Sequence, residues 1–282
     1  MREYLRPDSL GEALGHLAKG GFTVVAGCTD YYCRPDARPF ADDIIDLTGL
    51  SEARGISDAA EYFRIGALTT WSELATSGLP PQFDALAEAA RQVGGVQIQN
   101  AGSIGGNLCN ASPAADGVPP LLMLDAVVEL RSAAGVRLLP LDTFILGNRR
   151  TALRPDELLT AILVPKRPGR QASRFLKLGA RAYQVISIVM VAALLEAGAD
   201  GRIVRAAVAV GSCSPVARRL AALEQELAGR PLSGAPLSAT LSPAHLAGLT
   251  PLSDVRGTAG YRLEAARHLV RRALDALQEN LR

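Results

Sequence analysis

The chain of 282 residues lacks several features that would each mark a definite class of protein. Its longest apolar run, Ile188 to Leu195, is far shorter than the ~20 residues that a membrane helix needs. Four cysteines are too few for a disulfide framework, and the N-terminal residues hold no apolar signal region. Aromatics make up 5% of the residues and are not interleaved with basic ones. We therefore expect a cytoplasmic protein that crosses no membrane and binds no nucleic acid.

Residues with chemistry of their own are also scarce. The three histidines lie in or beside predicted helices, and none forms a nucleophile pattern with a serine or cysteine. Cys28 and Cys33 have the first spacing of a plant-type iron–sulfur motif, but the next cysteine of that motif does not follow. Cys109 and Cys213 are remote from them. No metal site is predicted, so any reactive chemistry should belong to a bound cofactor.

The charged residues divide the chain into two halves. Residues 1–165 carry 13 Lys and Arg against 20 Asp and Glu, whereas residues 166–282 carry 17 against 8. Such a dipolar chain suits a complementary partner or a charged ligand, although the two halves can also neutralise each other.

A polar segment at residues 166–173, broken by proline and glycine, predicts a domain boundary. We expect a first domain at 1–168, with subdomains of about 1–55 and 56–168, and a second domain at 169–282.

Hydrophobic periodicity predicts helices and strands in no strict alternation, which favours an α+β fold. The predicted strands are 22–27, 42–49, 62–68, 126–141 as a hairpin, 157–165, 175–181, 185–198 and 203–212. The predicted helices are 8–21, 69–75, 83–95, 119–126, 215–229 and 259–280. In the last helix an apolar stripe of Leu263, Ala266, Val270, Leu274 and Leu277 faces the core, and the arginines lie on the remaining surface.

Two glycine-bearing loops are the most unusual feature, "VVAGCTDYY" at 24–32 and "AGSIGGNLCNASPAAD" at 101–116. Gly105 and Gly106 let the backbone approach a bulky anion, and their N–H groups, with Ser103, Thr29 and Asn107, are candidate donors to phosphate oxygens. Neither loop matches the Rossmann G-x-G-x-x-G or the P-loop motif. The simpler interpretation, that both are only glycine-rich turns, stays open.

Two charged residues are further candidates. Asp116 is placed either to cap the helix that follows it or to accept a hydroxyl of a ribityl or sugar group. Lys177 is one of three lysines in a chain with 27 arginines. It suits an electron-rich ring, although a solvated surface lysine is the simpler interpretation.

Four segments resemble one known family, the FAD-binding medium subunit of molybdenum hydroxylases, of the xanthine dehydrogenase and aerobic carbon monoxide dehydrogenase type. They are "VVAGCTDYY", "QNAGSIGGNLCNASPAAD", "FLKLGAR" and "PLSDVRGTAGYR", and they occur in the family's order. The resemblance covers essentially the whole chain. It implies a two-part FAD-binding domain of the PCMH or vanillyl-alcohol-oxidase type, followed by a smaller α+β domain with a three-stranded sheet and helices.

The resemblance also implies the residues that bind FAD. A first loop would consist of Val24, Val25, Ala26, Gly27, Cys28, Thr29, Asp30 and Tyr31, with the residues from Gly27 to Asp30 against the pyrophosphate. A second would consist of Gly102, Ser103, Gly105, Gly106, Asn107, Cys109, Asn110 and Asp116. Leu158 and Leu159 would border the ring system or the adenine, and Lys177 would lie near the flavin.

The chain departs from the family pattern at two places. Cys28 stands where the family has glycine, histidine or asparagine, and Gln184-Val185 stands where two aspartates are common. The cysteine-bearing insertion of benzoyl-CoA-type members is missing, so no extra iron–sulfur cluster is expected.

By resemblance, the chain is an oxidoreductase subunit without catalytic residues of its own. It would take electrons from the [2Fe–2S] clusters of a small subunit, in a complex whose large subunit carries the molybdenum cofactor, and pass them to NAD+ or another acceptor. Relatives imply a dimer of heterotrimers. Two alternatives stay open: a stand-alone FAD-dependent oxidoreductase, for which Tyr183 is the best acid or base, and a bridging subunit that has lost FAD.

Overall fold

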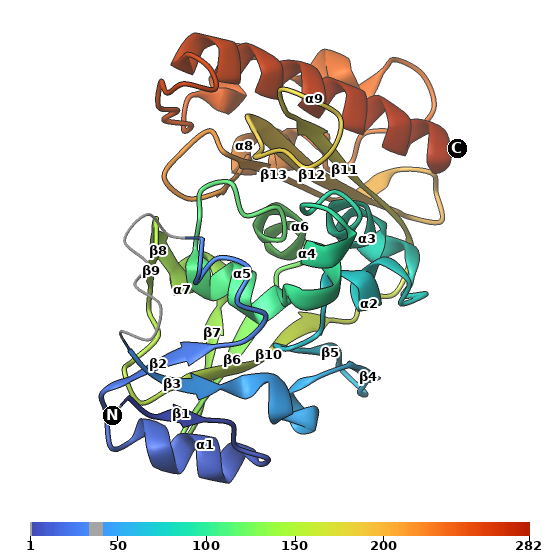
Figure 1. Cartoon of the computed structure of the whole chain (residues 1–282). Helices are drawn as coiled ribbons and strands as arrows, with labels where there is room; N and C mark the ends of the chain where they lie inside the picture. The colour runs from blue at the N-terminus through green and yellow to red at the C-terminus, as the bar shows by residue number, and fades with distance from the viewer. Residues whose placement is uncertain (1, 34–41) are drawn as a thin grey trace. The chain divides into compact units, whose positions relative to one another are not determined.

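The computed structural model describes residues 2–33 and 42–282, which form two compact units (Figure 1). The first unit consists of Met1–Leu74, Val96–Ala111 and Ala126–Lys166, and the second of Ala75–Gly95, Ser112–Asp125 and Arg167–Arg282. Because the chain passes repeatedly from one unit to the other, neither unit is a single continuous stretch of sequence.

The first unit contains two main sheets. One is a parallel sheet in the order β1-β3-β2, with β1 at Tyr4–Leu5, β2 at Phe22–Val25 and β3 at Asp43–Asp46. The other is antiparallel in the order β4-β5-β10-β6-β7. Its strands are β4 (Ile56–Asp58), β5 (Tyr62–Gly66), β6 (Val127–Ser132), β7 (Gly135–Pro140) and β10 (Leu158–Pro165).

Short helices complete the first unit. Helix α1 (Leu10–Leu17) begins where the Ser9 hydroxyl accepts the Glu12 N–H, and its buried face packs with Ile45 and Leu158. The other short elements are α2 (Trp71–Ala75), α4 (Val96–Ala101), α5 (Ile104–Asn110), α7 (Leu141–Phe144), the hairpin β8 (Ile145–Gly147) with β9 (Arg150–Thr151), and the 3₁₀ turns η1 (Leu47–Gly49) and η2 (Ser51–Ala53).

The second unit is built on an antiparallel sheet in the order β11-β12-β13-β14. Three strands are long, namely β11 (Arg170–Leu178), β12 (Val189–Ala197) and β13 (Ile203–Gly211), while β14 is the residue pair Arg218–Arg219. The expectation of a small C-terminal sheet with helices is confirmed.

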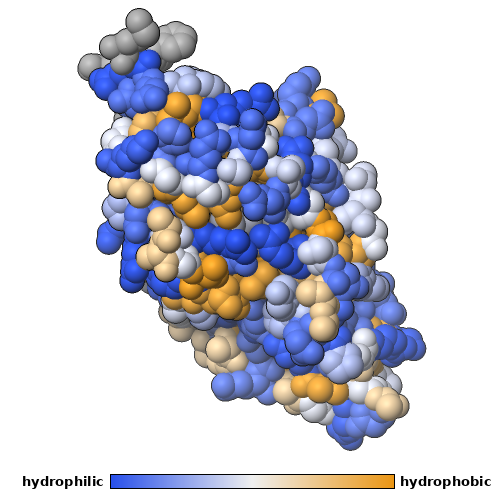
Figure 2. Space-filling view, turned by 90° about the horizontal axis from the view of Figure 1, so that it is seen from below, coloured by the Kyte–Doolittle hydropathy of each residue, from blue (hydrophilic) through white to orange (hydrophobic). Residues whose placement is uncertain are grey.

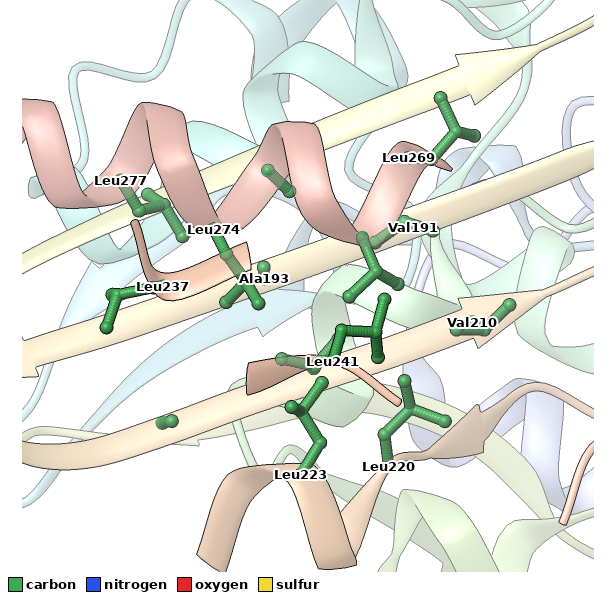
Figure 3. Packing of buried hydrophobic residues seen from close by; sticks show 14 of the residues in the cluster. Val191, Ala193, Val210, Leu220, Leu223, Leu237, Leu241, Leu269, Leu274 and Leu277 are labelled. Atoms are coloured by element: carbon green, nitrogen blue, oxygen red, sulfur yellow. The ribbon is translucent and has the colours of Figure 1, made fainter. Parts of the chain in front are cut away.

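Both faces of this sheet are covered, which explains the unbroken apolar run in β12. Val189, Val191 and Ala193 belong to the core under α9 (Ala259–Asn280), together with α8 (Ala221–Leu227) and the turns η4 (Leu237–Thr240) and η5 (Pro243–Leu246). Figure 3 shows leucines of these elements meeting Val191, Ala193 and Val210. The helices α3 (Asp84–Ala90) and α6 (Val118–Met123), with the turn η3 (Pro81–Phe83) before α3, also pack on the sheet. A strand buried on both faces has no polar side to alternate with its apolar one.

Three predictions about local structure are wrong. Most of the glycine-rich segment 101–116 is not a loop, because α4 and α5 take up residues 96–101 and 104–110. The helix predicted at 215–229 begins only at Ala221, since Arg218 and Arg219 pair with β13 instead. In α9 the apolar stripe is confirmed, but Arg262 lies inside the core at 5% exposure rather than on the surface.

The surface carries scattered apolar side chains. On the face shown in Figure 2, hydrophobic groups of limited extent lie between hydrophilic ones. Among residues 2–33 and 42–282, no helix combines the length and the apolar character needed to cross a bilayer. Because the apolar groups on the face shown in Figure 2 are small and separated, they do not indicate where a partner would bind on that face.

Candidate functional site

The first candidate loop leaves β2 and is held against the end of α4 by backbone packing. A Cβ on Gly27 would lie 1.8 Å from the carbonyl oxygen of Ala101, so only glycine fits there. The Thr29 hydroxyl lies near Gly102, since a Cβ on Gly102 would be 3.4 Å from its oxygen. The two segments that the sequence singled out are far apart along the chain but are thus neighbours in the first unit.

Cys28 gives this loop its turn, with a φ of 57° in the left-handed region. Glycine and asparagine adopt this region more easily than other residues do. A cysteine at this position, where the family pattern has glycine, histidine or asparagine, therefore carries backbone strain. Burial and the nearby Asp46 carboxylate raise the pKa of the Cys28 thiol, so the sulfur is not a reactive thiolate. In the described part of the chain, no acceptor is found for the backbone N–H groups of Thr29 and Asp30. A turn with free N–H groups next to a left-handed residue is a common anion-binding arrangement.

Tyr31 and Tyr32 close the described part of this loop. Their rings meet edge to face at 4.9 Å, and the Tyr31 hydroxyl donates to the Asp42 carboxylate at 2.5 Å. Before the turn, Val25 is buried, Ala26 half-buried and Val24 exposed. The loop is therefore buried where it leaves β2 at Val25, and its polar groups, Asp30 and the Tyr31 hydroxyl, lie towards its other end.

The backbone N–H groups at the start of α5 are already bonded within the protein. Gly105 donates to the Ala67 carbonyl at 2.8 Å, and Gly106 donates to the Ser103 hydroxyl at 3.2 Å. The structure therefore contradicts the expectation that these two N–H groups are available to phosphate oxygens, because a contact with the segment after β5 uses the Gly105 N–H and the Ser103 cap of α5 uses the Gly106 N–H.

Glycines of the second segment serve two different purposes. A Cβ on Gly105 would come within 2.7 Å of Ala67, so this glycine allows close packing inside the protein rather than approach of a ligand. Gly106 is exposed, and a Cβ there would meet only the Ser103 oxygen at 3.0 Å. Gly106 is therefore the position on α5 where the backbone is open.

The side-chain oxygen of Asn107 is a buried hydrogen-bond acceptor. Its Oδ1 has no hydrogen-bond partner among the described residues, whereas buried polar groups are paired in the large majority of cases. Two residues further on, burial raises the pKa of the Cys109 thiol to about 12. Asn110 ends α5, and Ala111 follows in the left-handed region with a φ of 48°. An unsatisfied Asn107 oxygen fits a ligand hydroxyl.

In the second unit, Asp116 and Lys177 form a buried ion pair. The ammonium donates to Asp116 Oδ2 at 2.6 Å and to the Gln92 carbonyl at 3.1 Å, and both charged side chains are less than a tenth exposed. Ser187 donates to Asp116 Oδ1 at 2.5 Å. Burial raises the pKa of the Asp116 carboxyl, while Lys177 and Ser187 act against that rise.

This geometry excludes both simpler interpretations of the charged pair. Asp116 does not cap α6, whose N-terminus has no side-chain cap, and Lys177 is not a solvated surface lysine. Sequence reasoning missed Ser187 and Gln92, which carry no motif and are recognisable only by their contacts with the pair.

Leu158 and Leu159 lie in β10 and are buried within the protein. Leu158 belongs to the core beneath α1, and Leu159 lies opposite Leu130 in the sheet. That they border a cofactor stays a prediction. The structure thus brings the two glycine segments together in the first unit and Asp116 with Lys177 in the second.

Comparisons with known proteins agree with the motifs. The model of the FAD binding domain in molybdopterin dehydrogenase matches residues 1–167, and that of the CO dehydrogenase flavoprotein C-terminal domain matches residues 174–277. The chain is 32% identical to the nicotinate dehydrogenase FAD-subunit of Eubacterium barkeri, over 86% of this chain and 85% of that one.

Two solved structures share the fold over nearly the whole chain. One is carbon monoxide dehydrogenase from Hydrogenophaga pseudoflava, lacking the Mo-pyranopterin moiety of its molybdenum cofactor, with a TM-score of 0.87 and 29% identity over 98% of this chain and 96% of that one. The other is quinoline 2-oxidoreductase from Pseudomonas putida 86, with a TM-score of 0.88 and 26% identity over 100% and 98%. The three relatives are named for three different substrates.

Proposed function

Since this chain belongs to the FAD-binding flavoprotein subunits of the molybdopterin dehydrogenases, we propose that it transfers electrons within a molybdenum hydroxylase complex. It is an oxidoreductase subunit whose cofactor is FAD. In the proposal it takes electrons from the [2Fe–2S] clusters of a small partner subunit and passes them to NAD+ or another acceptor. Substrate oxidation belongs to a large subunit with the molybdenum cofactor.

The buried pair Asp116–Lys177 is the single observation that carries the cofactor site. Two motifs 61 residues apart meet at 2.6 Å, in a position where neither charge is needed for solubility. Charges are buried at a cost of several kcal/mol each unless they are paired, and such pairs are common at functional sites. We assign the pair to the flavin and ribityl part of FAD.

Further candidate residues for FAD lie in the first unit. The free N–H groups of Thr29 and Asp30 suit the pyrophosphate, and the Asn107 oxygen suits a hydroxyl donor. Gly106 leaves room for close approach, while Gly27 and Gly102 fix the first loop on its support. When bound, FAD accepts electrons singly and releases them in pairs, which suits a relay from one-electron clusters to a two-electron acceptor.

This chain's residues have a binding and orienting role in the proposal. They hold the cofactor, exclude water and set the local electrostatics. Cys28 and Cys109, whose thiol pKa values are raised, supply no nucleophile.

The two alternatives are less well supported. A stand-alone oxidoreductase would need an acid or base, and the best candidate, Tyr183, is 77% exposed on the loop between β11 and β12. A bridging subunit without FAD would have no reason to keep the buried Lys177–Asp116 pair and the unpaired Asn107 oxygen.

The test is to purify the complex through a tag on this chain from its own host. We expect one large and one small partner, with molybdenum and iron in the complex and FAD released from this chain on denaturation. The mass of the intact complex tests the dimer of heterotrimers. After reduction by dithionite and removal of the excess, NADH formation on adding NAD+ identifies the acceptor. Recovery of a flavin-bearing chain alone that oxidises substrates without partners would favour the stand-alone alternative.

A further inference from the structure

The fourth motif, residues 251–262, contains a buried arginine that the proposed function does not use. Arg262 lies on the inner face of α9 at 5% exposure. Its guanidinium donates to the Ile188 carbonyl at 2.6 Å, the Ser212 carbonyl at 3.1 Å and the Asp254 carboxylate at 2.7 Å. A charge buried so deeply has been placed to hold those three groups together.

The two carbonyls belong to the strand ends that support the Asp116 segment. Ile188 directly follows Ser187, whose hydroxyl donates to Asp116 Oδ1 at 2.5 Å. The N–H of Ser212 itself donates to the Pro113 carbonyl at 3.0 Å, three residues before Asp116. Arg262 therefore binds the carbonyls of the same two strand ends whose Ser187 hydroxyl and Ser212 N–H bond to the segment that carries Asp116.

Ser212 shows why this support is needed. Its φ of 62° lies in the left-handed region, where a residue other than glycine is strained by about 1–2 kcal/mol. The Arg262 hydrogen bond to its carbonyl and the bond from its N–H to Pro113 hold this conformation in place. Without Arg262, the Ser212 carbonyl loses its hydrogen bond to the guanidinium, while the Ser212 N–H and hydroxyl keep theirs to the Pro113 carbonyl.

Asp254 supplies the counter-charge. Its carboxylate bonds to the Arg256 N–H and to Arg262, and it forms a second, exposed ion pair with the Arg256 side chain at 3.4 Å. The hydrogen bond from the Arg256 N–H holds the pKa of the Asp254 carboxyl below its usual range; burial opposes it, and the Arg262 guanidinium adds to the lowering. Arg256 is thus a matched control, because its side chain shares the counter-ion but touches neither strand end.

We infer that Arg262 is a positioning residue for the Asp116–Lys177 pair, and that the fourth motif exists to fix that pair for the cofactor. The inference rests on the proposed function, since only the proposal assigns the pair to FAD. An ammonium cannot replace this guanidinium fully, because the fork reaches three acceptors in fixed directions.

The test measures the FAD dissociation constant of the full chain by flavin titration, alongside denaturant unfolding without FAD. We expect Arg262→Gln to weaken FAD binding about tenfold, which corresponds to about 1.4 kcal/mol, and Arg262→Lys to lie between it and the wild type. Arg256→Gln should change the constant less than about twofold, as an exposed pair does. Equal values for Arg262→Gln and the wild type would overturn the inference.

A double-mutant cycle separates positioning from general destabilisation. In an Asp116→Asn background, Arg262→Gln should have little further effect on FAD affinity, whereas a purely structural effect would be the same in both backgrounds. If Arg262→Gln does not fold, Ser187→Ala is the second variant. It removes the hydrogen bond that joins the start of β12 to Asp116 while leaving Arg262 in place, and it should give a similar loss of FAD affinity. Unchanged affinity in Ser187→Ala would contradict the inference. A wild type that binds no FAD would remove the proposed function and the inference together, whereas a binding wild type with an additive cycle would remove the inference alone.

Discussion

The candidate ligand-binding residues of the two units differ in physical character. In the first unit the candidate residues offer mainly backbone: Gly27 and Gly102 pack against carbonyls or a neighbouring ring, and the turn after β2 has N–H groups without an acceptor among the described residues. In the second unit they offer side-chain charge, with Lys177 and Asp116 buried together. A site built from closely packed backbone is disrupted by a substitution that adds side-chain atoms, whereas a buried ion pair is disrupted by a substitution that removes one of its charges. The two kinds of damage should therefore be separable by stability and by FAD binding.

The largest effect is expected from removing one partner of the buried pair. Lys177→Met leaves the Asp116 carboxyl buried without its ammonium, which typically costs about 3–5 kcal/mol of unfolding free energy. Lys166→Met is the matched control, since the pair of Lys166 with Asp58 is exposed and such pairs contribute about 0–1 kcal/mol. Denaturant unfolding of both variants compares them directly. Similar losses in the two variants would contradict the special position of Lys177.

A steric change in the first unit should come next. Gly27→Ala places a Cβ against the Ala101 carbonyl and should cost about 3 kcal/mol, because the backbone has to move. Gly106→Ala, at an exposed position in the first turn of α5, should change stability by less than about 0.5 kcal/mol. If Gly106 faces the cofactor, its variant should lose FAD affinity while keeping its melting temperature. Normal FAD binding by Gly106→Ala would remove this residue from the proposed site.

Outside the site, the second unit contains another charge cluster with a definite pH dependence. Asp125 accepts from Arg205 at 2.6 Å, Arg167 at 2.7 Å and Arg219 at 2.9 Å. Burial opposes ionisation, but Arg205 and Arg219 outweigh it and hold the pKa of the Asp125 carboxyl below its usual range. A lowered native pKa contributes stability above the unfolded value of about 3.9, and this contribution disappears as pH falls through the native pKa.

The check is Asp125→Asn, because asparagine tolerates the φ of 54° at this position. The stability gap between wild type and variant should be largest at neutral pH and should narrow below about pH 4. Unfolding curves across that range measure it. A gap that stays constant down to pH 3 would assign its origin to packing instead of charge.

The smallest effect is expected at Cys28. Cys28→Gly relieves a left-handed strain of about 1–2 kcal/mol but adds chain entropy of about 0.5–1 kcal/mol to the unfolded state. We expect a gain of up to about 1 kcal/mol, with FAD binding retained. Loss of FAD in this variant would show that the thiol itself contacts the cofactor.

Sequence periodicity predicted the elements whose packing is regular. The last helix is predicted at 259–280 and is found at Ala259–Asn280, and all of the apolar run 188–195 except Ile188 lies in the strand buried on both faces. The segment around α5 was misread because glycine and asparagine are poor helix formers, and its helices depend on contacts with Thr69 and Ala67. Helix propensities describe single residues and their neighbours along the chain, so they do not predict these tertiary contacts.

Motifs in the sequence predict which residues belong to the candidate site, but they do not predict how those residues contact one another. Lys177 and Asp116 could each be named, yet their pairing depends on a fold that joins positions 61 residues apart. Arg262 was placed on the surface because the stripe of Leu263, Ala266 and Val270 is regular without it, and a single charge inside a helix carries no sign of burial. The use of Gly105 for internal packing is likewise visible only in three dimensions.

The central claim is that this chain binds FAD, and we propose that the open backbone at Gly106 and the buried Asp116 carboxylate each contribute to the binding. Its most direct test is the flavin content of the tagged chain purified with its partners, together with FAD titration of Gly106→Ala and of Asp116→Asn. We predict about one FAD per chain, as for a dedicated flavoprotein subunit, and weaker binding in both variants. A folded chain that carries no flavin, takes up none in the assembled complex, and is unchanged by either substitution would contradict the account.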